Sequence, residues 1–216
     1  MYYDISQSVP QRGGGEETPE NRRIHEIANE LNRRCQLYEA ELRIGQEYVS
    51  RLELEQRAAE QYAKDNSIWI PMAEVFDLGV PGPSGNENDT YVSGDIIYKV
   101  NNLLNSGSIS RLLDKVAMHN NLFYDTAYTL YAFTGFDGRT VMPVLRQHLV
   151  KNARPATQIE IDTYLAALGF EKMSEEGRFS NGIYKLWDLV PRNVLKDASG
   201  DIFVIDAEIA LICKNT

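Results

Sequence analysis

Apolar residues recur at helical spacing over the first third of the chain. Residues 20–64 are rich in Glu, Arg, Leu and Ala. The apolar positions before Gly45 are Ile24, Ile27, Leu31, Cys35, Tyr38 and Leu42, and Tyr48, Leu52 and Ala59 continue the series after it. This spacing predicts one long helix, or two helices broken near Gly45, with an apolar stripe that packs on a neighbouring sheet or on a partner chain. Residues 1–19, with three consecutive glycines and acids, indicate disorder or a linker.

Short β-branched runs separated by turn residues dominate the middle of the chain. Residues 90–92 and 95–100 are strand-like around a Ser93-Gly94 turn. An amphipathic helix with Ser108 as its N-cap follows. Its apolar positions are Ile109, Leu112, Leu113, Val116 and Ala117. Residues 128–150 then predict two further strands joined by residues 135–138.

The last third predicts a helix over 157–170 that stops at Gly169, and then a β-hairpin. The apolar runs 194–195 and 202–205 flank turn-forming residues. If Ser199-Gly200 is a two-residue loop, Asn193 falls directly opposite Asp206. Opposed residues on one face have Cβ atoms about 4.5–5.5 Å apart.

An amide oxygen and a carboxylate at that separation suit a hard cation. Mg²⁺ takes oxygen ligands and usually only one or two carboxylates from a protein. Asp188, just before the hairpin, is placed to accept a proton from a hydroxyl near that metal. The alternative is a surface hairpin with solvated acids at its ends.

The segment Asp188-Leu-Val-Pro-Arg-Asn193, followed by Ile-Asp206-Ala-Glu, resembles the catalytic loop and metal-binding strand of the protein kinase-like superfamily. The resemblance implies that Asp188 is the catalytic base and that Asn193 and Asp206 hold Mg²⁺. It also implies that Arg192 neutralises charge on the transferring phosphoryl group. Leu186-Trp187 replaces the usual His-Arg and Ala207-Glu208 the usual Phe-Gly, which puts protein-kinase regulation in doubt more than phosphoryl chemistry.

A kinase also needs a lysine on a strand behind a glycine-bearing loop. Lys99, in Ile-Ile-Tyr-Lys, resembles the phosphate-pairing lysine, and its alternative is a solvated strand lysine. Gly79, Gly82 and Gly85 lie ahead of it at three-residue spacing. Glycines let backbone N–H groups approach phosphate oxygens, so the resemblance implies a lid over the nucleotide, although a plain loop has the same composition.

Two further nucleotide contacts follow from the resemblance alone. Asp114 is the only acid on the helix that carries the lysine-pairing glutamate in kinases. Residues 147–150 match the hinge, whose backbone binds adenine, so Gln147 and Leu149 are assigned to the ATP site.

The sequence is most similar to the kinase-like domain of bacterial polyvalent proteins, the long multidomain chains of phages and conjugative elements. The segments that carry the similarity are "SGNENDTYVSGDIIYK", "HNNLF" and "LWDLVPRNVL", and it extends from about Trp69 to Ile212. It implies an α+β fold: a kinase-like small lobe, with an antiparallel five-stranded sheet plus a helix, and a reduced large lobe that ends just after the metal-binding Asp. The implied divisions are 1–19, a helical extension over 20–66, a small lobe over 67–150 and a truncated large lobe over 151–216.

The acidic composition of the chain bears on which classes of partner it can bind. A formal net charge of -9 and a pI near 4.9 argue against non-specific binding to nucleic acid or to an anionic membrane. No apolar run is long enough to span a membrane, the N-terminus is not a signal peptide, and Cys35 and Cys213 form no disulfide framework or metal pattern, so a cytoplasmic location is expected.

Two functions fit the sequence. The first is a Mg-ATP-dependent phosphotransferase that acts on a hydroxyl of a protein or a small molecule. The second is a catalytically inactive, pseudokinase-like module that binds nucleotide or a partner protein.

Overall fold

The computed structural model describes residues 18–45, 49–136 and 140–212 of the 216-residue chain. The expected segment 1–19 lies outside the described residues except for residues 18 and 19. Cys213 and residues 137–138 of the predicted 135–138 connection also lie outside them. Two compact units are present: the described part of Met1–Ala117 with Tyr128–His148, and Met118–Ala127 with the described part of Leu149–Thr216. Each unit is described by itself below.

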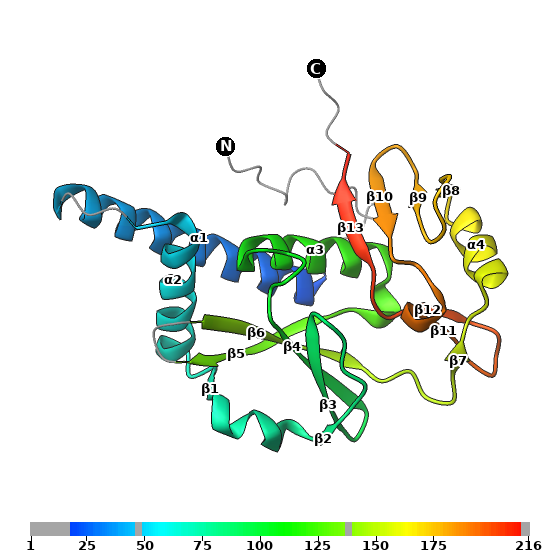
Figure 1. Ribbon diagram of the computed structural model, residues 1–216, viewed down its shortest axis with the longest axis horizontal. Coiled ribbons are helices and arrows are strands. Elements are labelled where there is room, and N and C mark those ends of the chain that lie inside the picture. Colours follow the sequence, from blue (N-terminus) through cyan, green and yellow to red (C-terminus); the bar gives the residue numbers. More distant parts are fainter. Residues whose placement is uncertain (1–17, 46–48, 137–139, 213–216) are drawn as a thin grey trace. The chain divides into compact units, whose positions relative to one another are not determined.

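The first unit is a sheet with helices packed on it (Figure 1). Its helices are α1 (Pro19–Gly45), α2 (Arg51–Asp65), the 3₁₀ helix η2 (Met72–Leu78) and α3 (Ile109–Leu122). The boundary between the two units falls within α3. Its strands are β1 (Trp69–Pro71), β2 (Val80–Pro81), β3 (Asn88–Ser93), β4 (Ile96–Asn101), β5 (Thr129–Phe136) and β6 (Thr140–His148). The predicted break near Gly45 and the N-cap Ser108, whose Oγ accepts from Arg111 N–H at 3.3 Å, are confirmed.

The sheet differs from the expected one in strand number and direction. Its six described strands run in the order β1-β5-β6-β4-β3-β2, where five antiparallel strands were expected. The extra edge strand β1 pairs in parallel with β5, and Phe133 N–H donates to Ile68 O at 2.9 Å. The β3–β4 turn is also one residue later than predicted, because Ser93 pairs with Ile96 and leaves Gly94-Asp95 as the loop.

The predicted apolar stripe of the N-terminal helices is used inside this unit. One continuous core joins α1, α2 and α3 to one face of the sheet. Fully buried members include Ile24, Ile27, Leu31, Ala58, Ala59, Leu112, Leu113, Val116 and Phe133. A smaller cluster, with Val75, Tyr91, Val100, Ala132 and Val144, lies under η2. The helices are therefore part of the sheet's core, although Leu52 of the predicted stripe is 48% exposed and Tyr48 lies outside the described residues.

A carboxylate from α2 caps the N-terminus of α3. Glu55, only 6% exposed, accepts from the backbone N–H groups of Ile109 at 2.8 Å and Ser110 at 2.9 Å, and from the Ser110 hydroxyl. These N–H groups have no partner inside the helix, and a negative charge there also favours the helix dipole. Glu55 therefore fixes α2 to the first turn of α3.

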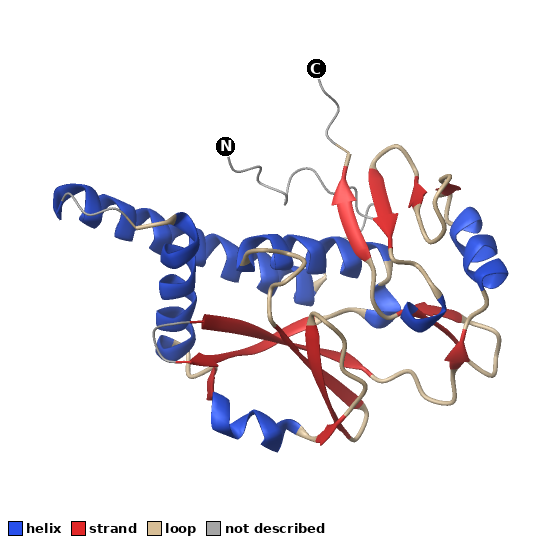
Figure 2. Cartoon of the chain, in the orientation of Figure 1, coloured by secondary structure: helices blue, strands red, loops and turns tan. Residues whose placement is uncertain are grey.

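The second unit is built mainly from short strands and the helix α4; in Figure 1 its segment 118–127 is green and the rest runs from yellow-green to red. Its elements are η3 (Tyr124–Thr126), β7 (Arg154–Pro155), α4 (Gln158–Ala167), β8 (Glu171–Lys172), β9 (Phe179–Ser180), β10 (Tyr184–Trp187), η4 (Pro191–Asn193), β11 (Val194–Lys196), β12 (Ile202–Val204) and β13 (Glu208–Leu211). Two sheets form, in the orders β13-β10-β9-β8 and β12-β11-β7, drawn in red in Figure 2. The predicted α4 stop is confirmed, since Gly169 follows its C-cap with a φ of +81°.

The predicted hairpin is present, but its register is off by one. Val194 pairs with Val204 and Lys196 with Ile202, so Asn193 falls opposite Ile205 and not opposite Asp206. The loop has three residues rather than two, because Asp197 pairs with Asp201 through its N–H and Gly200 takes a φ of +98°. A three-residue loop with glycine in the left-handed region is a common hairpin connection.

Candidate functional site

Pairing between β10 and β13 brings the predicted base Asp188 and the predicted metal ligand Asp206 to the same end of one sheet in the second unit. Asp188 directly follows β10, and Asp206 lies two residues before β13. Trp187 at the end of β10 pairs with Glu208 at the start of β13. Asp188 and Asp206 therefore lie at the same end of this sheet. The sequence pattern does not indicate β13, the strand that brings these two residues to the same end of the sheet.

Asn193 lies between the two acids. Its Nδ2 donates to Asp188 Oδ2 and to the Asp188 backbone O, both at 2.8 Å. Its own backbone O accepts from Ile205 N–H at 2.9 Å and from Asp206 N–H at 3.4 Å. The shifted hairpin thus still joins Asn193 to Asp206, through the backbone.

Asp188 has a positive φ angle, and both of its carboxylate oxygens have polar partners. Its φ of +60° is in the left-handed region, which Asp tolerates better than most residues but which still costs energy. Arg192 Nη2 forms an ion pair with Oδ1, while Asn193 occupies Oδ2. The Arg192 side chain is 71% exposed, so this ion pair is largely in solvent. Strained backbone of this kind clusters at functional sites.

The donor set is chemically suitable for Mg²⁺. Asp206 would supply a carboxylate, and Asn193, whose Nδ2 donates to Asp188, would supply its amide oxygen. Nowhere in the described residues do three His, Cys, Asp or Glu side chains gather as a metal cluster. Mg²⁺ retains waters and phosphate oxygens beside one or two protein carboxylates, so a two-residue set fits it better than a metal that demands a full protein cage.

The strand β12, which precedes Asp206, accepts a hydrogen bond from a buried threonine. Thr126, 1% exposed, donates its hydroxyl to Val204 O at 2.6 Å. His119 Nε2 lies 3.2 Å from the same hydroxyl oxygen. The usual catalytic-loop histidine is replaced in this chain, and Thr126 supports β12 from a different segment. No sequence signal marks Thr126, because it is 78 residues from its partner.

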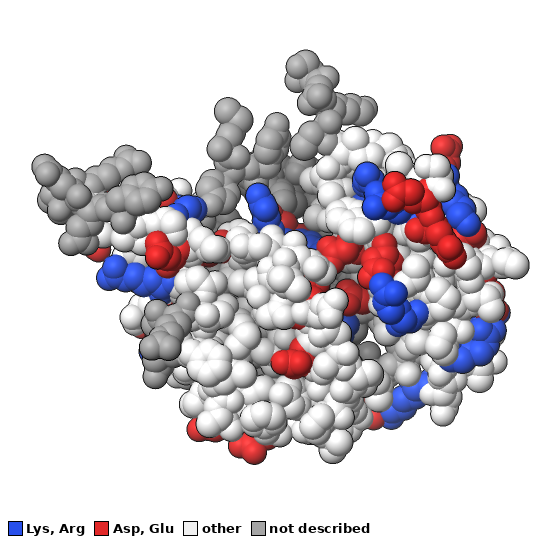
Figure 3. All heavy atoms as spheres, viewed as in Figure 1, with Lys and Arg blue, Asp and Glu red and all other residues white. Residues whose placement is uncertain are grey.

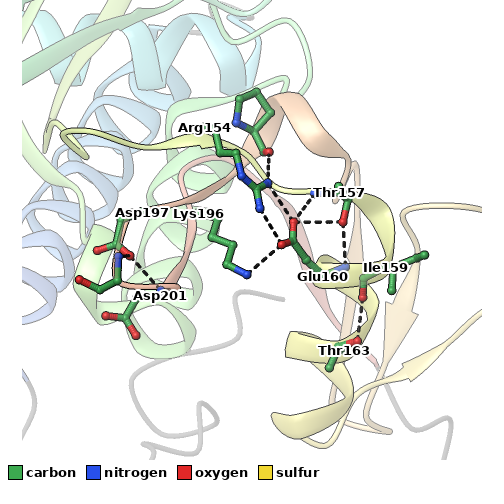
Figure 4. A network of polar contacts seen from close by, with 10 residues as sticks. Arg154, Thr157, Ile159, Glu160, Thr163, Lys196, Asp197 and Asp201 are labelled. Carbon is green, nitrogen blue, oxygen red and sulfur yellow. Dashed lines mark hydrogen bonds and ion pairs between the residues drawn. The ribbon is translucent and has the colours of Figure 1, made fainter.

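A second polar network supports the base of the hairpin (Figure 4). Glu160, in the first turn of α4, accepts from Arg154 of β7, from Lys196 of β11 at 2.8 Å and from the Thr157 N-cap. Arg154 first, and then Lys196, hold the pKa of the Glu160 carboxyl far below its usual range. The network joins α4 to the β7–β11 pair, so the hairpin is tied to the helix before it.

In the first unit, Lys99 is a buried side chain in the middle of the sheet. It lies on β4 between Thr90 of β3 and Leu145 of β6, and it is 7% exposed. Its Nζ donates to the Tyr128 hydroxyl at 2.7 Å. A buried, hydrogen-bonded ammonium excludes the alternative of a solvated strand lysine.

The three glycines lie at the β2–β3 edge with different surroundings. A Cβ on Gly79 would meet Val92 O at 2.4 Å and one on Gly82 would meet Thr90 Oγ1 at 2.7 Å, whereas Gly85 faces open space. The N–H groups of Gly82 and Gly85 donate to Thr90 O at 2.9 Å and Asn88 O at 3.0 Å. Close strand packing therefore accounts for the first two glycines, and two of the three amides are committed to the hairpin.

The remaining predicted contacts are also placed. Asp114 lies on α3, where burial raises its pKa to about 6 against the opposing charge of His25. Gln147 is 3% exposed on β6 opposite Ile97, and Leu149 begins the second unit directly after His148. The change of unit thus falls inside the segment predicted as the hinge.

The face of the molecule drawn in Figure 3 carries mixed charge. On the face drawn in Figure 3, Lys and Arg are interspersed with Asp and Glu, and that face has no continuous basic field. No helix in the described residues combines the length and apolarity needed to cross a membrane.

Comparison with known proteins gives one match. The model of a family described as "Serine/Threonine/Tyrosine Kinase found in polyvalent proteins" matches residues 53–212, which is more than half of the chain. The match begins within α2 and so includes Glu55. No curated protein matches the sequence.

Proposed function

The chain belongs to the family of kinases found in polyvalent proteins, and from that premise we propose that it is a Mg-ATP-dependent phosphotransferase acting on a hydroxyl of a protein or a small molecule. The observation that carries the proposal is the contact set around Asn193. This one residue donates to Asp188 through its side chain and accepts from Asp206 through its backbone.

Each residue has a distinct role in the proposal. Asp188 accepts the proton of the acceptor hydroxyl, and Asn193 orients the Asp188 carboxylate by donating to Oδ2. Asp206 and the Asn193 amide oxygen would hold Mg²⁺, which neutralises phosphate charge when bound. Lys99 contributes a positive charge to the phosphates. Arg192, exposed and able to leave Asp188, pairs with the transferring phosphoryl group.

The proposal also assigns residues to the nucleotide. The loop with Gly79, Gly82 and Gly85 would lie over the phosphates, and the segment at Gln147 and Leu149 would give backbone groups to adenine. Asp114 keeps the position on α3 that the resemblance gives to the lysine-pairing acid, and the charges that act on it include those of His25 and Glu55.

A catalytically inactive, nucleotide-binding or protein-binding module is the second candidate. Two observations favour it. Arg192 and Asn193 already occupy both carboxylate oxygens of Asp188, and the Gly82 and Gly85 amides are already used in the hairpin. It predicts a folded protein without transfer of phosphate.

A thermal-shift titration with ATP, with and without Mg²⁺, tests the metal-nucleotide site. A ligand that binds only the native state stabilises it by about 2.7 kcal/mol at a hundredfold excess over Kd. We expect a Mg-dependent stabilisation that Asp206→Asn removes. Asp201→Asn is the matched control, because it removes the same charge from an exposed position on the same hairpin. Equal loss in both variants, or no stabilisation of the wild type, would contradict the proposed site.

A further inference from the structure

The segment 119–123, "HNNLF", which carries part of the family similarity, ends α3 and leads into a buried turn. Phe123 N–H donates to His119 O at 2.7 Å, and Thr126 N–H donates to Phe123 O at 3.0 Å. The rings of His119 and Phe123 lie 5.2 Å apart. These contacts bring Thr126 beside His119, and both residues belong to the same unit as β12.

The buried contacts of Thr126 indicate where the protons lie. Its hydroxyl oxygen is 2.6 Å from Val204 O and 3.1 Å from Phe123 O, so we assign the single hydroxyl proton to the nearer acceptor, Val204. His119 Nε2 lies 3.2 Å from the Thr126 backbone O, which can only accept, and 3.2 Å from the Thr126 hydroxyl oxygen. His119 Nε2 therefore carries a proton, which it donates to Thr126.

One peptide group joins Thr126 to the predicted metal ligands. The C=O of Val204 accepts from the Thr126 hydroxyl, and the N–H of the same peptide group, that of Ile205, donates to Asn193 O at 2.9 Å. A peptide group is planar, so fixing both of its ends sets the direction in which the chain leaves β12. Asp206 comes next, and its own N–H lies 3.4 Å from Asn193 O.

We infer that Thr126 is a positioning residue for the Mg²⁺ ligands Asn193 and Asp206, and that His119 holds its hydroxyl in place. The inference rests on the proposed function. Thr126 and His119 are each 1% exposed, and hydrogen bonds in series strengthen one another in such an environment. Groups that hold the ligands of a metal without touching it typically change metal affinity by about 10- to 100-fold.

Calorimetric titration of the full chain with ATP, once with Mg²⁺ and once with chelator, tests this inference. The ratio of the two affinities, the Mg-dependent gain, reports on the metal site. Thr126→Val removes the hydroxyl at nearly constant shape. We expect it to reduce the gain about tenfold, because Thr126 acts on the peptide beside a ligand, and to leave the affinity for ATP in chelator unchanged. Thr126→Ser keeps the hydroxyl and should keep most of the gain.

Ile161→Val is the control, because Ile161 is fully buried on α4 in the same unit. It removes one buried methylene and should lower Tm, but it leaves every hydrogen bond of β12 in place, so the Mg-dependent gain should not change. Thr126→Ala takes the place of Thr126→Val if that variant does not fold.

Three results would contradict the account. If Asp206→Asn removes the Mg-dependent gain and the variant without the Thr126 hydroxyl keeps it, the inference is overturned and the proposed function stands. An equal loss in Thr126→Ser or in Ile161→Val also overturns the inference, because the loss would then reflect packing. A wild type whose affinity for ATP does not depend on Mg²⁺ overturns the proposed function, and the inference with it.

Discussion

Removal of the Glu55 carboxylate should separate α2 from the first turn of α3. Glu55→Ala deletes the acceptor of two backbone bonds, at 2.8 and 2.9 Å, in a site that is 6% exposed. Loss of a charged acceptor from buried donors, together with loss of a favourable charge at a helix N-terminus, costs about 2–4 kcal/mol. Glu55→Gln keeps one acceptor oxygen without the charge, so we expect about half that cost.

Urea denaturation followed by circular dichroism measures the free energy of unfolding, and hydrogen exchange locates the change. The amides of Ile109 and Ser110 should exchange faster in Glu55→Ala. Glu60→Ala is the matched control on the same helix, because Glu60 forms a surface i,i+4 pair with Lys64 and its removal should cost under about 0.5 kcal/mol. If Glu55→Ala were as stable as Glu60→Ala, with unchanged exchange at Ile109, the capping role would be refuted.

Three further outcomes are expected. Asp114→Asn should stabilise the fold at pH 7. Burial raises the folded pKa of the Asp114 carboxyl to about 6, so the wild type loses stability as the pH rises from about 4 to 6, and the variant should lose less. A pH series of urea midpoints checks this. Gly79→Ala should lower Tm, since its Cβ would meet backbone 2.4 Å away, while Gly85→Ala, in open space, should not; equal Tm values would contradict this. Thr126→Val should cost about 1–3 kcal/mol by leaving Val204 O without its donor, and Thr126→Ser should restore most of it; a loss equal in both variants would assign the cost to packing.

The sequence pattern was sufficient for the helices and for the C-terminal hairpin. Helical spacing located α1, α2 and α3, and turn residues located the C-terminal hairpin. The predicted register of the hairpin was wrong by one residue. The sequence is compatible with a two-residue or a three-residue loop, and the positive φ of Gly200 gives the longer one. Asn193 and Asp206 are still in contact after the shift, because the Asn193 backbone O accepts from Asp206 N–H.

Contacts between distant segments could not be predicted. Tyr128 is 29 residues from Lys99 and Glu55 is 54 residues from Ile109, and neither pair follows any helical or strand period. The glycine spacing was an ambiguous signal for a similar reason, because a glycine required by a neighbouring strand looks the same in sequence as one required by phosphate. Such contacts depend on tertiary packing, which a single sequence does not specify residue by residue.

Transfer of the γ-phosphoryl group tests the central claim most directly. The measurement follows label from γ-³²P-ATP into the protein itself and into added hydroxyl acceptors, with Mg²⁺ and with chelator, for the wild type and for Asp188→Asn. Loss of a catalytic base typically costs about 10²–10⁴ in rate, so Asp188→Asn should lose transfer while it still binds MgATP. Mg-dependent transfer in the wild type alone is the predicted result. Transfer that is undiminished in Asp188→Asn would contradict the assignment of the base, and a wild type that binds MgATP without any transfer would favour the inactive module.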